Sequence, residues 1–224
     1  MQSATLGHRQ VAAQAPVGER LAFLKKVYGL LSLSVLLAAG AAWITSNNMP
    51  FASFVAQNML MFFILEIAAI FFTFWARKRE TMGLIALFSF TILTGVTTTP
   101  LLLRYTGGTV TMAAFLTGLT FAGLSLYALT TKKDLSFMGG MLRTGLILLI
   151  VGSLLNAFLF KSAWGSFGIS CVGVFLFSGF ILYDTKNIMH RYPTDEVISA
   201  TLTLYLDILN LFIFILNILG FSSD

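Results

Sequence analysis

Charged residues are scarce in this chain of 224 residues: 10% are Asp, Glu, Lys or Arg, whereas 57% are hydrophobic. Soluble domains carry about 25% charged residues, so the composition excludes an ordinary soluble domain and predicts an integral membrane protein. Cysteine is nearly absent, and the lone Cys171 excludes an intramolecular disulfide. We expect Cys171 to be a small buried hydrophobic side chain.

Proline and histidine are also rare, and their positions exclude several kinds of site. The four prolines fall at or beyond the ends of long apolar runs, where a missing N–H does least harm to a helix. His8 and His190 lie outside those runs. A serine nucleophile within the membrane would therefore lack a histidine base, and no transition-metal ligand set is visible.

Apolar runs of about 18–22 residues recur along the chain, and each can cross a hydrocarbon core of about 30 Å as a helix. They predict an all-α membrane protein with seven transmembrane helices, near residues 27–45, 55–75, 82–103, 109–130, 142–160, 166–187 and 197–219. We expect residues 23–224 to form one transmembrane domain and residues 1–22 to be a disordered cytoplasmic tail. The first run should be retained rather than cleaved, because its polar leader is long and six further runs follow.

Lys and Arg are concentrated on one side of the predicted membrane. Twelve of the 14 precede the first run or lie in the second, fourth and sixth connections: Arg9, Arg20, Lys25, Lys26, Arg77, Lys78, Arg79, Lys132, Lys133, Arg143, Lys186 and Arg191. The positive-inside rule then predicts a cytoplasmic N-terminus and, with seven crossings, an external C-terminus. A last run that re-enters would instead return the C-terminus to the cytoplasm. Topology thus explains the net charge of +5 without a nucleic-acid partner.

Three acids, Glu66, Asp184 and Asp207, lie within the apolar runs. An aspartate costs about 2.5–3.5 kcal/mol at the centre of a spanning helix, so intramembrane acids mark functional sites by default. Asp184 lies near the cytoplasmic end of its run, and Asp207 enters from the same side, so their depths allow contact. Two carboxylates in one low-dielectric site share a proton, which lowers the cost of burying Asp207.

Two predicted helices carry a polar face. Glu66, Thr73 and Arg77 share one face of the second run, at about 100° per residue. Within the last run, polar residues fall in an arc of about 80°: Ser199, Thr203, Asp207, Asn210 and Asn217. Interhelical hydrogen bonding would explain the Ser, Thr and Asn residues but poorly explains an aspartate. Glu66, Thr203 and Asn210 are therefore candidates for a polar pathway.

Three segments together resemble the Bax-inhibitor-motif family of membrane proteins, bacterial branch: FSGFILYDTKNIMHR (177–191), SLYALTTKKDLSF (125–137) and LTLYLDILNLFIFILNILG (202–220). The resemblance covers the chain from about residue 20. It implies two three-helix layers around a central last helix. It also implies an inner-membrane, pH-sensitive calcium leak governed by an aspartate pair, matched here by Asp184 and Asp207. Arg77, in FWARKRE, resembles the family's latch arginine, which pairs with the first aspartate, and Glu66, in ILEIAA, resembles its second-helix acid.

The segment TTKKDLSFMGGML (130–142) resembles a bacterial member that binds and restrains a membrane-anchored AAA protease. Such a protease is therefore a second candidate partner, besides the lipid bilayer. That member departs from the aspartate pattern, so the two acids here favour the ion-linked function. An intramembrane aspartyl protease is less favoured because LYLD (204–207) lacks glycines before its aspartate, and a proton-coupled transporter because no inverted repeat is visible.

We therefore predict a non-enzymatic protein with Asp184 and Asp207 as its pH-sensing pair. Both are also the candidate metal ligands, because calcium prefers several oxygen ligands, some of them anionic. Calcium would be a permeant or weakly bound ion, with Glu66, Asn210 and water as further ligands. No organic cofactor is expected. Arg77 is either the latch or an ordinary positive-inside cation.

Overall fold

The computed structural model describes residues 11–221, and helices dominate that part of the chain. Seven helices are long and apolar enough to cross a membrane, whereas the nine-residue α2 is too short. The elements are α1 Val17–Ser46, α2 Met49–Gln57, α3 Met59–Ala76, α4 Glu80–Leu102, α5 Gly107–Thr130, α6 Met138–Leu155, the π-helical turn η1 Asn156–Phe160, α7 Ala163–His190 and α8 Val197–Phe221. The all-α class with seven transmembrane helices is confirmed.

Polar caps set several helix boundaries. The hydroxyl of Thr106 accepts a hydrogen bond from the backbone N–H of Thr109 at 3.2 Å and starts α5, and Ser162 starts α7 in the same way. Asn58 ends α2, because its side-chain amide donates to the carbonyl of Phe54 at 2.8 Å. The predicted start of the second span at residue 55 was therefore wrong: α2 occupies that position and the spanning helix begins at Met59.

Residues 11–22 of the expected disordered tail have a defined place in the structure. Val11 forms an isolated antiparallel bridge with Pro193, and the backbone N–H of Ala12 donates to the carbonyl of Tyr192 at 2.8 Å. Ala12 is fully buried, and α1 already begins at Val17. The prediction of disorder was wrong for this part, because pairing with the α7–α8 connection orders a segment that has little structural preference of its own. Residues 1–10 lie outside the described residues.

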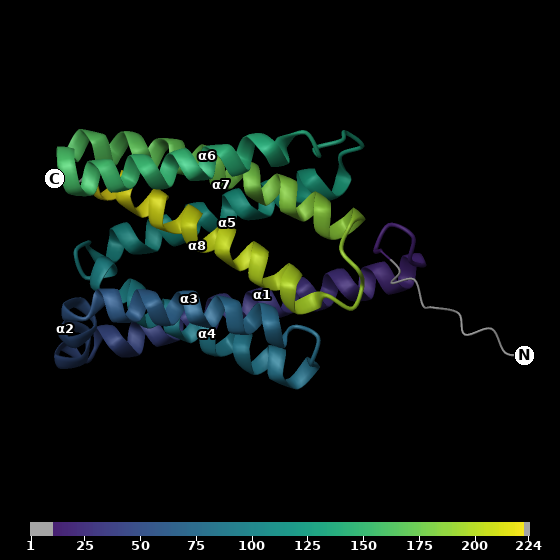
Figure 1. Ribbon diagram of the computed structural model, residues 1–224, viewed down its shortest axis with the longest axis horizontal. Coiled ribbons are helices and arrows are strands. Elements are labelled where there is room, and N and C mark those ends of the chain that lie inside the picture. Colours follow the sequence, from purple (N-terminus) through teal and green to yellow (C-terminus); the bar gives the residue numbers. More distant parts are fainter. Residues whose placement is uncertain (1–10, 222–224) are drawn as a thin grey trace, which may run out of the picture.

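Helix α8 runs between two groups of helices. In Figure 1, α1, α3 and α4 lie below it, and α6 and α7 lie above it. Helix α5 packs on α7 and α8 and so belongs with the upper group, while α8 itself contacts α1, α3, α4, α5 and α7. The central last helix implied by the resemblance is thus confirmed.

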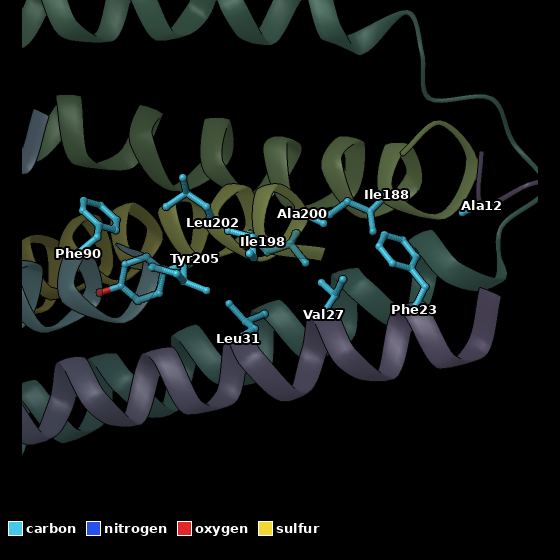
Figure 2. Close-up of a cluster of buried hydrophobic side chains, with 12 residues drawn as sticks. Ala12, Phe23, Val27, Leu31, Phe90, Ile188, Ile198, Ala200, Leu202 and Tyr205 are labelled. Atoms are coloured by element: carbon cyan, nitrogen blue, oxygen red, sulfur yellow. The ribbon is translucent and has the colours of Figure 1, made fainter. Parts of the chain in front are cut away.

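Two clusters of buried apolar side chains hold α8 in this position. The N-terminal half of α8 packs on α1, α4 and the end of α7, and Figure 2 shows Phe23, Val27 and Leu31 of α1 on one side of that cluster. The C-terminal half packs on α5, α6 and α7 through Ala113, Leu149, Phe177, Ile181, Leu211, Ile215 and Leu216. Dense packing of this kind is a main source of helix association in lipid.

Gly95 marks the close approach of α1 and α4. A Cβ atom at Gly95 would meet the backbone of Ala38, which cannot rotate away, whereas a Cβ at Gly123 of α5 would meet nothing within 4 Å. We expect Gly95→Ala to lower the free energy of unfolding by about 1–3 kcal/mol, as overpacking does. Gly123→Ala should leave it unchanged or raise it slightly, because alanine favours helix. Thermal unfolding of both variants in the same detergent checks this, and equal midpoints would contradict it.

Candidate functional site

Asp184 of α7 and Asp207 of α8 lie against each other inside the bundle. Their side chains lie close enough to interact directly, and Asn187, one turn after Asp184, also lies near the Asp184 carboxyl group. Two ionised carboxylates have only acceptor atoms, so a hydrogen bond between them requires one proton. The structure therefore brings the two predicted acids together, and their closeness favours a shared proton over two buried charges.

Burial makes that proton important for Asp207. Its side chain is 5% exposed, and its Oδ2 atom receives no hydrogen bond from an amide, amine or alcohol among the described residues. Taking an isolated carboxylate out of water is very costly unless it is paired or neutralised. A proton shared with Asp184 would lower this cost, because the pair would then carry at most one charge.

Arg77 does not lie against the pair. Its Nη1 atom lies 3.9 Å from Oε2 of Glu196, which directly precedes α8. Helix α3 ends at Ala76, so Arg77 belongs to the group of α1, α3 and α4, on the other side of α8 from α7. The expected contact with Asp184 is therefore replaced by one with Glu196, and any latch that Arg77 forms acts through Glu196.

Glu66 lies in a separate polar contact between α3 and α4. The hydroxyl of Thr97 donates to Glu66. One turn earlier on α4, the hydroxyl of Thr94 contacts that of Tyr205 on α8. No group of three His, Cys, Asp or Glu side chains in residues 11–221 is placed to hold a metal ion. Glu66 is thus not a third carboxylate beside Asp184 and Asp207.

The polar face of α8 points into the protein, as its pattern predicts. Thr203 donates to the carbonyl of Ser199 at 3.0 Å, and Asn210 donates to the carbonyl of Leu206 at 2.8 Å. Near the far end, Asn217 accepts a hydrogen bond from Tyr105 at 2.9 Å. Thr203 and Asn210 therefore lie on the same helix face as Asp207, but each donates a hydrogen bond to a backbone carbonyl of α8 itself.

Sequence reasoning missed three residues at or near the α7–α8 connection that lie next to predicted site residues. Asn187 could have been found from its spacing, because residues three apart share a helix face. Glu196 stands at the start of α8, where an acid is favoured by the helix dipole. Tyr192 lies 3.3 Å from the hydroxyl of Thr203, and burial raises the pKa of its phenol, which therefore stays neutral. Its place depends on the fold of the α7–α8 connection, which no local pattern indicates.

Seven spanning helices, of which α8 is central and carries one acid of a buried carboxyl pair, define a multi-pass membrane protein with an ionisable site inside the bilayer. The family model described as inhibitor of apoptosis-promoting Bax1 matches residues 20–224. The chain belongs to this Bax inhibitor family.

Similar proteins come from bacteria and from mouse. A Campylobacter jejuni protein is 41% identical over 210 residues, which cover 90% of this chain and 89% of the relative. The modulator of FtsH protease YccA from Escherichia coli is 35% identical and is aligned over 89% of this chain and 90% of its own length. Mouse protein lifeguard 4 is 33% identical, with 92% and 88% covered. The resemblance read from the sequence is confirmed.

Proposed function

We propose that this protein is a pH-sensitive calcium leak of the inner membrane, not an enzyme, and that the Asp184–Asp207 pair governs it. The observation that supports this most is the close approach of two carboxyl groups, of which Asp207 is buried on the central helix. Such a pair changes its charge when it gains or loses the shared proton. Because α8 contacts both groups of helices, a change in that charge acts where the two groups meet.

Calcium suits the pair as a passing ion rather than as a tightly held one. Calcium takes about six to eight oxygen ligands, of which two carboxylates supply at most four. With Glu66 elsewhere, water must complete the shell. A calcium ion binds best to the fully ionised pair, so protons and calcium compete and acid weakens calcium binding.

The experiment that tests this function is calcium uptake into liposomes that contain the purified protein, measured from about pH 5 to 8. We expect flux above that of protein-free liposomes and a clear dependence on pH. Flux equal to that of protein-free liposomes at every pH would contradict the proposal.

The orientation is part of the same proposal, and the arrangement of the connections supports it. The α7–α8 connection contacts Ala12 before α1 and, through Glu196, Arg77 in the α3–α4 connection. Lys186 near the end of α7 donates to the carbonyl of Thr131 in the α5–α6 connection. The cation-rich connections therefore gather at one end of the bundle, as a cytoplasmic face with positive charge requires.

Reporter fusions test the orientation. Fusions at residues 48, 106 and 163 and at the C-terminus should report an external position, and fusions at residues 79 and 134 a cytoplasmic one, because the cations lie in the latter connections. The two sets act as controls for each other. A cytoplasmic C-terminal fusion would show that α8 does not cross the membrane.

A second candidate function is modulation of a membrane-anchored AAA protease. Its support is the 35% identity to the E. coli modulator of FtsH protease over nine-tenths of both chains. The two functions differ in their need for the acids. The test measures how fast the host's membrane-anchored AAA protease degrades a membrane substrate in the presence of this protein. Modulation is the function if the wild type and the double variant Asp184→Asn with Asp207→Asn slow degradation equally and the liposomes show no calcium flux.

A further inference from the structure

A basic cavity of about 780 Å³ lies where the start of α1, the α5–α6 connection and the last turns of α7 meet. Five Lys or Arg side chains and one acid are among its lining residues: Arg20, Lys132, Lys133, Lys186, Arg191 and Asp134. The cations come from three separate elements of the fold. The cavity is therefore a product of tertiary structure, and it concentrates positive charge in a concave site.

The carboxylate in the lining already has partners within its own loop. Oδ1 of Asp134 accepts the backbone N–H of Ser136 at 2.9 Å, and Oδ2 accepts the hydroxyl of Ser136 at 2.8 Å. These hydrogen bonds lower the pKa of Asp134, with a smaller contribution from Arg191 and Lys186. Asp134 thus stabilises the loop as a carboxylate, and the lining of the cavity has more positive than negative side chains.

Two inner groups of the cavity have hydrogen-bonding capacity left. Lys186 donates one N–H to the carbonyl of Thr131, which fixes its ammonium group at the cavity wall. An ammonium group carries three N–H donors, so two remain for a ligand. The Nε2 atom of His190 is buried and has no hydrogen-bond partner among the described residues. An anion with several acceptor oxygens would satisfy both, with His190 as the tautomer that carries its proton on Nε2.

The surroundings of the cavity suit a lipid headgroup. Phe137 directly follows the lining residue Ser136 and is 73% exposed, and Met141, one turn further along α6, is 61% exposed. Exposed apolar side chains at the end of a spanning helix face acyl chains, while the basic cavity lies at that end of the helices, where headgroups are. Clusters of Lys and Arg directly beside spanning helices attract anionic lipids.

We propose that the basic cavity binds a phosphate group, carried by the headgroup of an anionic phospholipid or by a soluble phosphate anion. Arg20 and Arg191 each offer a planar guanidinium that can bind two phosphate oxygens at once. Lys186 and His190 contact the ligand from the inner wall, and Lys132 and Lys133 from the loop.

The test measures binding of phosphatidic acid with a fluorescent acyl chain to the full chain in a neutral detergent. Diacylglycerol with the same chains tests the phosphate requirement, and competition by inorganic pyrophosphate tests soluble phosphate. We expect Lys132→Gln with Lys133→Gln to weaken binding about tenfold, since each lost charge-assisted hydrogen bond is a strong one. The matched control, Lys25→Gln with Lys26→Gln, removes two exposed cations from α1 outside the cavity and should change affinity less than about twofold.

Each outcome decides the proposal. Displacement of the lipid by pyrophosphate shows a site open to both sources, and binding that pyrophosphate does not displace shows a lipid phosphate site. Arg20→Gln, on another element, supplies a second variant if the loop variant does not fold. Equal binding of diacylglycerol, equal weakening by the control variant, or no binding at all would overturn the proposal. The readout is binding, so the result does not depend on the calcium leak.

Discussion

Asp184→Asn and Asp207→Asn are each expected to flatten the pH dependence of calcium flux. Asparagine has nearly the shape of aspartate and keeps hydrogen-bonding capacity, so the change reports charge more than packing. One proton exchanged at a site changes calcium affinity by at most about tenfold per pH unit, and loss of the shared proton should remove that slope. Calcium affinity and flux from about pH 5 to 8, measured for both variants and the wild type, check this.

The double variant separates a pair from two independent acids. Residues that act as one unit are not additive, so Asp184→Asn with Asp207→Asn should be little worse than either single variant. Glu80→Gln, which removes an exposed acid at the start of α4, is the control and should keep the wild-type profile. Single variants with the wild-type pH profile would reduce the aspartates to structural hydrogen-bonding residues and favour the protease-modulator function.

Breaking the Arg77–Glu196 contact is expected to raise the resting leak. The contact joins the end of α3 to the start of α8, so its loss should favour states in which α8 moves relative to α3. The atoms are 3.9 Å apart and Arg77 is 35% exposed, so the pair contributes at most about 1 kcal/mol. Arg77→Ala and Glu196→Gln should each increase flux by up to about fivefold, measured in the same liposomes.

Three further variants show whether the contact itself is responsible. Arg77→Lys should retain most of the closure, because the contact uses one nitrogen atom rather than the two of a bidentate fork. Exchanging the charges, with Arg77→Glu and Glu196→Arg together, should recover part of it. Lys78→Ala removes a neighbouring cation and should leave the flux unchanged. If Arg77→Ala and Lys78→Ala behave alike, Arg77 is only a topology charge.

The helices and the acid pair could be predicted from the sequence because both depend on patterns within single helices. Long apolar runs define the spans, and the arc of polar residues on the last run identifies Asp207 as facing protein. Asp184 and Asp207 enter the membrane from the same side of a short connection, so their depths follow from counting residues. Helical geometry gave their depths, and the short connection made packing of the two helices against each other the expected arrangement.

The partners of Arg77 and Glu66 could not be predicted in this way, because they depend on which helices pack together. For Arg77 to face Asp184, helix α3 would have to pack on α7, yet these two helices lie on opposite sides of α8 (Figure 1). Glu66 accepts a hydrogen bond from Thr97 on α4. Helix α4 carries several threonines, and their spacing does not indicate which of them would contact an acid on another helix. The bridge between Val11 and Pro193 joins segments that lie far apart along the chain. No local pattern indicates such a pairing, so the sequence predicted a disordered tail before α1.

The central claim is that Asp184 and Asp207 share one proton and exchange it for a cation. Infrared difference spectroscopy of the reconstituted protein, with isotope-labelled aspartate to separate the signal from Glu66, measures this directly. We expect a protonated aspartate carboxyl band near neutral pH that disappears when calcium is added and is absent in the double asparagine variant. A wild-type protein without that band, or with a band that calcium leaves unchanged, would contradict the account.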